Sequence, residues 1–323
     1  MKRKLNILIA CEESQAVCRA FRKLGHNAYS CDLFKCSGTI FNTDQLEPHP
    51  EWHFDHDVTT VLDKSDLILQ DGNQAVIEGD WDLMIGHPPC TFLACSGAKW
   101  LYDPNDKRKP HPNFPDRRKD QEAGANFFMF LANADVKRIA IENPVGIMST
   151  RWRKPDQSVQ PYMFGDPYSK NTCLWLKNLR PIHPSRPTND HGERIYFGSG
   201  KSQPLWYSDG LTKTKTKEER QKWRSKTFPN IARVFAEQWT IQIAAEENLL
   251  DDNEWDILGR NYLEVLDKMT GGIRYTTSNK DIIIEKKRFP SRFNPDLESE
   301  IERREQGLIE YWYKKEYLPN QKL

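Results

Sequence analysis

Short apolar runs alternate with segments of helical spacing at the start of the chain. The run at 5–10 predicts a buried strand, and the apolar positions within 15–24 predict a helix after it. Gly25 interrupts the helical spacing, and 28–31 predicts a second strand. This β-α-β order is typical of an α/β protein with a parallel sheet.

The rest of the chain continues this alternation, with one long polar segment in the middle. Strands are expected at 54–58, 83–85 and 136–141, an antiparallel pair at 162–165 and 172–176, and helices at 116–134, 230–245 and 297–317. Four prolines lie within 100–119, where no regular element is expected. A loop of this length in a compact domain is either a functional lid, closing on phosphate groups here, or a mobile surface segment.

Composition divides the chain into three parts. Residues 1–176 and 228–248 hold the predicted sheet and most of its helices. Residues 177–227 are rich in Pro, Lys, Arg and Ser and are interpreted as a small insertion. Residues 249–323 are expected to form a charged, largely helical extension.

The formal net charge is +1, so no global excess of positive charge indicates nucleic acid. Basic residues cluster locally at 107–109, 117–119, 213–217 and 286–288. The chain shows no secretory signal and no apolar run long enough for a membrane, which favours a cytoplasmic protein with reduced cysteines. The cysteine spacings do not match zinc motifs, so no metal is expected.

The strand predicted at 83–85 is followed by a sequence that places a thiol at the edge of the sheet. Two prolines, Pro88 and Pro89, cannot continue the hydrogen-bond ladder of a strand. Cys90 is therefore expected on a stiff turn past the carboxyl end of a strand, where ligands bind in open α/β sheets. It is a candidate nucleophile, and the alternative is a small buried apolar side chain.

Two other predicted strands end in acidic side chains. Asp32 follows the second strand, either as a solvated loop acid or as the acid that accepts hydrogen bonds from ribose hydroxyls in a nucleoside-binding sheet. The turn before the first helix contains Glu12 and Glu13 in place of a glycine fingerprint, which disfavours a pyrophosphate and suits a cationic or polar ligand. Glu142-Asn143 ends a later strand, as either a solvated strand end or a catalytic acid.

These segments occur in a defined order. Leu5–Val17 comes first, Pro89-Cys90 and Glu142-Asn143 follow, and a Thr-Phe-Pro-Asn-Ile-Ala segment at 227–232 comes last. With this order over roughly the first 245 residues, the chain resembles the cytosine C5-specific DNA methyltransferases, in particular the short versions common in phages. The resemblance implies a Rossmann-like class I methyltransferase sheet with helices on both faces, S-adenosylmethionine as cofactor and DNA as substrate.

The resemblance also implies roles for the residues that match the family's motifs. The implied catalytic residues are Cys90, Glu142, Asn143 and Lys170. The implied cofactor-binding residues are Ala10, Cys11, Glu12, Ser14, Asp32, Leu33, Asp57, Val58, His87, Pro88, Asn230 and Ile231. The implied DNA contacts are Ser96, Lys99, Arg117, Arg118 and Thr172.

Three motifs depart from the family pattern. The residue after Pro-Cys is Thr91 instead of glutamine, and the residue after Glu-Asn is Pro144 instead of valine. Lys170-Asn171-Thr172 stands where the family has Gln-x-Arg-x-Arg, so Lys170 is the candidate substitute for the arginine that holds the cytosine O2. Because the recognition insertion is small, the expected DNA partner is single-stranded or recognised with little sequence specificity.

In the family's chemistry a thiolate adds to cytosine C6 and makes C5 nucleophilic. Cys90 would supply the thiolate, with a pKa lowered by nearby positive charge or helix ends. Glu142 would hydrogen-bond N3 and the exocyclic amine, a role that suits a carboxylic acid if burial raises its pKa. Asn143 would orient the cysteine loop or the base.

Three other hypotheses stay open. The same scaffold could act on RNA or a nucleotide, or could use a modified S-adenosylmethionine. A non-catalytic relative would only bind nucleic acid, which the altered segment at 170–172 favours. A cysteine hydrolase using Cys90 and His87 is the third, although the sequence reveals no acid partner for the histidine.

Overall fold

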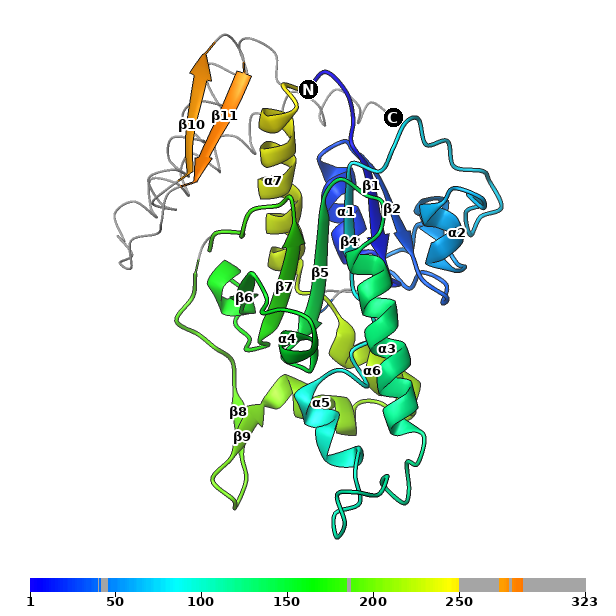
Figure 1. The fold of residues 1–323 in the computed structure, drawn as a ribbon, viewed down its shortest axis with the longest axis vertical. Coiled ribbons are helices and arrows are strands. Elements are labelled where there is room, and N and C mark those ends of the chain that lie inside the picture. Colours follow the sequence, from blue (N-terminus) through cyan, green and yellow to red (C-terminus); the bar gives the residue numbers. More distant parts are fainter. Residues whose placement is uncertain (40, 42–45, 185–186, 250–272, 279–280, 287–323) are drawn as a thin grey trace.

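A seven-stranded mixed sheet forms the centre of the molecule (Figure 1). The computed structural model describes residues 1–323 except 40, 42–45, 185–186, 250–272, 279–280 and 287–323. The sheet order is β3-β2-β1-β4-β5-β7-β6. Strands β1 to β5 are parallel to one another, and β7 is antiparallel to both β5 and β6. Its strands are β1 (Asn6–Ala10), β2 (Asn27–Cys31), β3 (His53–Phe54), β4 (Leu83–Gly86), β5 (Ile139–Pro144), β6 (Gln157–Val159) and β7 (Thr172–Lys177).

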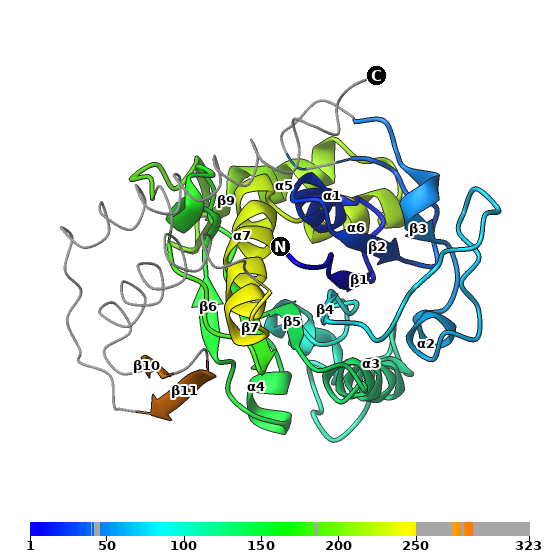
Figure 2. The same ribbon diagram turned by 90° about the horizontal axis from the view of Figure 1, so that it is seen from above.

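Helices cover both faces of this sheet (Figure 2). The α-helices are α1 (Ala16–Lys23), α2 (Val58–Leu62), α3 (Arg117–Ala132), α4 (Met148–Arg151), α5 (Leu205–Thr212), α6 (Lys217–Ser225) and α7 (Pro229–Glu246). Short 3-10 turns are η1 (Pro50–Trp52), η2 (Cys95–Trp100) and η3 (Pro161–Phe164). Two antiparallel hairpins lie outside the sheet, β8 (Arg194–Tyr196) with β9 (Ser202–Pro204) and β10 (Ile273–Ser278) with β11 (Asp281–Lys286).

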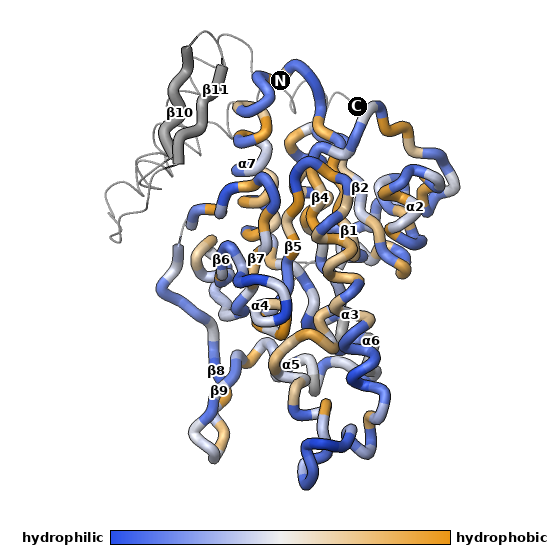
Figure 3. Tube along the Cα trace, viewed as in Figure 1, coloured by the Kyte–Doolittle hydropathy of each residue, from blue (hydrophilic) through white to orange (hydrophobic). Residues whose placement is uncertain are grey.

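Alternate side chains of β1 enter two separate hydrophobic clusters. Ile7 and Ile9 belong to the cluster that includes Phe235 of α7, whereas Leu8 belongs to the cluster that includes Phe128 of α3. Both faces of the strand are therefore buried, which explains why its sequence is apolar at nearly every position. Figure 3 shows this apolar centre and the polar loops around it. The expected Rossmann-like α/β sheet with helices on both faces is confirmed.

The expected strand at 162–165 is wrong. That segment lies mostly in the 3-10 turn η3, and the antiparallel partner of β7 is instead β6 (Gln157–Val159). Pro161 begins the turn and Gly165 ends it with a φ of 95°. Proline fixes φ and lacks a donor, and glycine accepts the left-handed conformation, so both residues favour a turn over a strand.

Other expected boundaries differ by a few residues. The strand expected at 54–58 is limited to His53–Phe54, because the Asp57 side chain accepts a hydrogen bond from Thr59 N and begins α2. The strand expected at 136–141 runs over Ile139–Pro144. The helix expected at 297–317 lies outside the described residues. Within the described part of the chain, no helix is long and apolar enough to cross a membrane.

The carboxyl ends of the parallel strands lie at one edge of the sheet, on the side of α5 and α6 in Figure 1. Both helices belong to 177–227, which was interpreted as an insertion. Ile182 and Trp206 of this segment nevertheless belong to the cluster that includes α7. The segment therefore contributes to the core, and the division of the chain into three parts stays a prediction.

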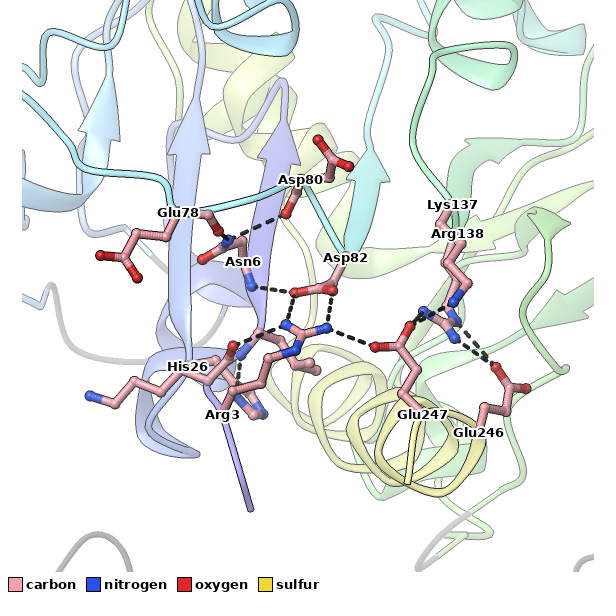
Figure 4. Close-up of polar contacts among 12 residues, drawn as sticks. Arg3, Asn6, His26, Glu78, Asp80, Asp82, Lys137, Arg138, Glu246 and Glu247 are labelled. Atoms are coloured by element: carbon pink, nitrogen blue, oxygen red, sulfur yellow. Dashed lines mark hydrogen bonds and ion pairs between the residues drawn. The ribbon is translucent and has the colours of Figure 1, made fainter. Parts of the chain in front are cut away.

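A network of ion pairs closes the opposite edge of the sheet (Figure 4). Arg138 is 2% exposed and contacts Glu246 at 2.9 Å and Glu247 at 2.7 Å. Glu247 also accepts from Arg3, which in turn pairs with Asp82 at 2.6 Å. The network joins the start of the chain, the segments before β4 and β5, and the end of α7, and so fixes where α7 ends on the sheet.

We expect Arg138→Ala to lower the free energy of unfolding by about 3 kcal/mol, because two partly buried carboxylates lose their shared cation. Lys137→Ala is the matched control, since Lys137 contacts the same Glu247 but is 61% exposed. Lys137→Ala should lower the free energy of unfolding by less than about 1 kcal/mol. Urea unfolding followed by tryptophan fluorescence measures both, and equal losses would contradict the assigned importance of Arg138.

Candidate active site

The turn that carries Cys90 is fixed by hydrogen bonds from two neighbouring strands. His87 N donates to the Ala10 carbonyl of β1 at 2.9 Å, and Asn143 Nδ2 of β5 donates to the Pro88 carbonyl at 2.8 Å. Asn143 is itself buried, so its amide cannot turn toward solvent. The sequence predicted that Asn143 orients either the cysteine loop or the base, and its contact is with the cysteine loop.

The Cys90 carbonyl also caps the next turn of chain. It accepts from Leu93 N at 3.0 Å and from Ala94 N at 2.9 Å. The turn is therefore held on both sides of the cysteine, and Cys90 as a residue is partly exposed at the carboxyl edge of the sheet. Cys90 thus lies on a turn past the carboxyl end of β4, as the two prolines predicted.

The environment of Cys90 raises the pKa of its thiol. Burial is the largest cause, Lys170 opposes it, and the negative charge of Glu142 adds to it. The expectation of a lowered pKa was wrong, because the positive charge of Lys170 does not compensate for the loss of water around the thiol. The resting residue is therefore a thiol that must lose its proton before it can attack.

Glu142 lies on β5 beside His87. His87 Nδ1 is 3.0 Å from Glu142 Oε2, and the side chains are 10% and 13% exposed, respectively. Burial alone would raise the Glu142 pKa, but Lys170, His87 and the Thr172 hydroxyl lower it by a larger amount. The condition that burial raises the Glu142 pKa overall is therefore not met, because three groups from other segments stabilise the charged form.

Lys170 and Thr172 approach this pair from β7 and the residues before it. Thr172 pairs with Pro144 in the β5–β7 register, and Lys170 lies two residues earlier. Lys170 Nζ donates to the Lys226 carbonyl at 3.2 Å, and Lys170 N donates to Gln160 Oε1 at 2.9 Å. The structure thus brings together all four residues predicted to be catalytic.

In the turn between β1 and α1, the Glu12 carboxylate faces the protein backbone and not a bound ligand. Glu12 is buried, and its carboxylate accepts from Val17 N at 2.6 Å and Cys18 N at 3.1 Å. It therefore satisfies the amino end of α1 in place of an external anion. Ala10 is buried in the strand, Cys11 has a positive φ of 61°, and the Ser14 hydroxyl accepts from Ala16 N at 3.4 Å.

Asp32 lies at the end of β2 with an exposed apolar neighbour. Its Oδ1 accepts from Phe34 N at 3.0 Å, and burial raises the pKa of the carboxyl. Leu33 is 74% exposed. Lys222 Nζ lies over the Phe34 ring, 4.8 Å from the ring centroid. A carboxylate beside exposed apolar side chains fits a ribose and an adenine ring, as S-adenosylmethionine would present.

The remaining predicted cofactor residues are partly engaged elsewhere. Asp57 caps α2 and Val58 is buried within that helix. Asn230 donates from its backbone N and its Nδ2 to Asp166, at 3.1 and 3.0 Å, and Ile231 is buried in the core. Burial raises the pKa of Asp166 to about 6. Sequence reasoning missed Asp166, because nothing in Phe-Gly-Asp-Pro identifies a partner 64 residues away.

The predicted DNA contacts lie around the segment after Cys90, except Thr172. Ser96 and Lys99 are exposed in η2, and Arg118 lies over the Tyr102 ring with 5.2 Å to its centroid. Arg117 donates to the Thr91 carbonyl at 3.1 Å and so joins the start of α3 to the residue after the cysteine. Four of the five thus share one surface, whereas Thr172 is buried near Glu142.

No protein-family model matches the chain, and no curated protein matches it. Among solved structures, the chain is similar to a candidate DNA modification methyltransferase encoded within a prophage (E. coli), with 12% sequence identity and a TM-score of 0.30. The similarity covers 60% of this chain, which spans 57% of the length of that protein. The roles of the site residues are therefore inferred from their own contacts.

The opposing charges around Cys90 predict alkylation rates that change in opposite directions. Lys170→Met should slow alkylation of Cys90 by iodoacetamide at pH 8 at least about threefold, because the thiol pKa rises further. Glu142→Gln should accelerate it, because a negative charge is removed.

Mass spectrometry of chymotryptic peptides measures both rates, with exposed Cys95 as the internal control. Changes of the same sign in both variants would contradict the assigned electrostatics.

Proposed function

We propose that this chain transfers a methyl group from S-adenosylmethionine to C5 of cytosine in DNA, through a covalent adduct between Cys90 and C6. The observation that carries the proposal is the convergence of a thiol, a buried carboxylate and a cation, from three separate segments, at the carboxyl edge of the sheet. A ligand in an open α/β sheet binds at this edge. The chemistry needs a nucleophile and a group that stabilises charge on the ring, and both are present.

Each residue has a distinct task in this reaction. Cys90 Sγ adds to C6 and turns C5 into an enamine-like nucleophile. Glu142 faces the N3 edge of the base, and Lys170 stabilises the negative charge of Glu142 and balances the thiolate. Asn143 keeps the Pro88 carbonyl, and with it the thiol, in place during attack.

The cofactor would be held at the ends of β1 and β2. Asp32 would accept from the ribose hydroxyls, and Leu33 would contact the adenine ring. When bound, S-adenosylmethionine supplies an electrophilic methyl group. Glu12 is directed into α1, so its contribution is to fix the shape of the turn beside the cofactor.

A basic and aromatic surface beside Cys90 supports DNA as the substrate. Residues 99–119 contain seven Lys or Arg and three Asp, in a chain of net charge +1. Trp100, Tyr102 and Phe114 are partly exposed on the same segment. Basic side chains bind phosphates, and exposed rings stack on unpaired bases, so this surface favours DNA with a flipped or single-stranded cytosine.

The hydrolase hypothesis receives less support. Glu142 does supply the acid partner for His87 that sequence reasoning did not find. However, within the described part of the chain no hydrogen bond joins Cys90 Sγ to the imidazole, whose Nδ1 faces Glu142. A base that does not contact the thiol cannot activate it directly.

The test uses deuterated S-adenosylmethionine, single- and double-stranded DNA, and mass spectrometry of the released nucleosides. Wild type should produce deuterated 5-methyldeoxycytidine. Cys90→Ser should reduce the product at least about 10³-fold, because hydroxyl is a far weaker nucleophile than thiolate at neutral pH. Cys95→Ser is the matched control, since Cys95 is exposed five residues away and should tolerate the change.

Retention of full activity in Cys90→Ser would overturn the covalent mechanism. Methylation at another atom of the base would overturn the assignment to C5. Product from RNA or a free nucleotide, with none from DNA, would show that DNA is not the substrate and that the enzyme methylates the other molecule.

A further inference from the structure

One face of α3 holds the chain that leaves the Cys90 turn. The helix begins at the carboxyl edge of the sheet (Figure 1). Arg117 Nη2 donates to the Thr91 carbonyl at 3.1 Å, and Gln121 Nε2 donates to the Phe92 carbonyl at 3.0 Å. Because the two side chains are one helical turn apart, they lie on the same face of α3. The first two carbonyls after the cysteine are therefore each bound by a side chain of this helix.

The same face of α3 continues to a close contact with the next residue, Leu93. Gly124 lies one turn further along the helix, and a Cβ added there would be 3.5 Å from Leu93 Cδ2. Leu93 is fully buried, in the hydrophobic cluster that also includes Phe128 of α3. Three consecutive residues after Cys90 thus contact three consecutive turns of the helix.

The opposite side of this segment is held by backbone groups between β5 and α4. Ile147 N donates to the Leu93 carbonyl at 2.9 Å, and Cys95 N donates to the Val145 carbonyl at 3.0 Å. A Cβ added to Gly146 would collide with the Leu93 carbonyl oxygen. Side chains of α3 are therefore the part of this clamp that substitution can remove selectively.

The guanidinium of Arg117 is enclosed by its own protein. Its Cζ lies over the Phe92 ring, 5.2 Å from the ring centroid. A Cβ added to Gly97 would lie 2.5 Å from Arg117 Nη2, so the missing side chain at 97 leaves the space that the guanidinium fills. Arg117 is partly buried, whereas Arg118 beside it is exposed. The two arginines, both implied DNA contacts, thus have different surroundings.

We propose that Arg117 is a positioning residue that aligns the Cys90 thiol with C6 by holding the Thr91 carbonyl, and that it does not bind DNA. This inference rests on the proposed function, in which the thiol must approach C6 in one geometry. A displacement of about 1 Å at a reacting atom costs about 10²-fold in rate. Arg118, which lies over the Tyr102 ring, remains available to a phosphate.

The test compares Arg117→Met with Arg118→Met in single-turnover methyl transfer at saturating DNA. Arg117→Met should lower the rate constant about 10²-fold and change the DNA Kd less than about threefold, because it moves the thiol and removes no DNA contact. Arg118→Met should instead weaken DNA binding, and the slope of log K against log salt should fall by about 1. Fluorescence anisotropy of labelled DNA at several salt concentrations measures the binding.

Two further variants separate positioning from damage to the fold. Arg117→Lys should restore the rate constant to within about tenfold of wild type, because an ammonium can also donate to the Thr91 carbonyl. Gly97→Ala should displace the guanidinium and slow the reaction. Combining Gly97→Ala with Arg117→Met should be no slower than Arg117→Met alone, since both act through one contact. Circular dichroism and cofactor affinity establish that each variant is folded.

Several results would overturn the role of Arg117. One is a wild-type rate constant in Arg117→Met, and another is a loss that lies in the DNA Kd with the salt slope of Arg118→Met. A third is no recovery in Arg117→Lys, or losses that multiply in the double variant, either of which indicates a general defect. Absence of 5-methylcytosine with wild type would instead reject the proposed function, and this inference with it.

Discussion

The candidate site depends on one constraint, which is the forced exit of the chain from the sheet at Pro88-Pro89. β4 is buried between β1 and β5, and two prolines end it at the carboxyl edge. The hydrogen bond from Asn143 to the Pro88 carbonyl then fixes the exit relative to β5. Without that exit, the thiol would continue into the sheet and could not meet a ligand.

The charge states of Cys90 and Glu142 depend on burial and on the cation of Lys170, which acts on both side chains. Burial disfavours a charge on both Cys90 and Glu142, and Lys170 favours a charge on both. Because Glu142 has two further stabilising partners, it keeps its charge while the Cys90 pKa stays raised. The arrangement places the anion on the carboxylate at rest, and Cys90 ionises for the attack.

Much of this architecture was predictable from the sequence, because the signals are local. Apolar runs marked β1, β2 and β4, and the prolines placed Cys90 at the correct edge. Failures came from contacts between distant segments. The pKa of Glu142 depends on Lys170, and Asn230 meets Asp166 only in three dimensions. Glu12 illustrates a second kind of failure, since periodicity cannot show that an acid turns back onto its own helix.

The most direct test of the central claim is trapping on DNA that contains 5-fluorocytosine. Fluorine at C5 cannot leave as a proton does, so a working enzyme stays attached to its methylated base. On a denaturing gel, wild type should give a shifted band that requires both S-adenosylmethionine and Cys90, with Cys90→Ala giving none. An adduct that persists in Cys90→Ala, or no adduct from a wild type that methylates unmodified DNA, would contradict the account.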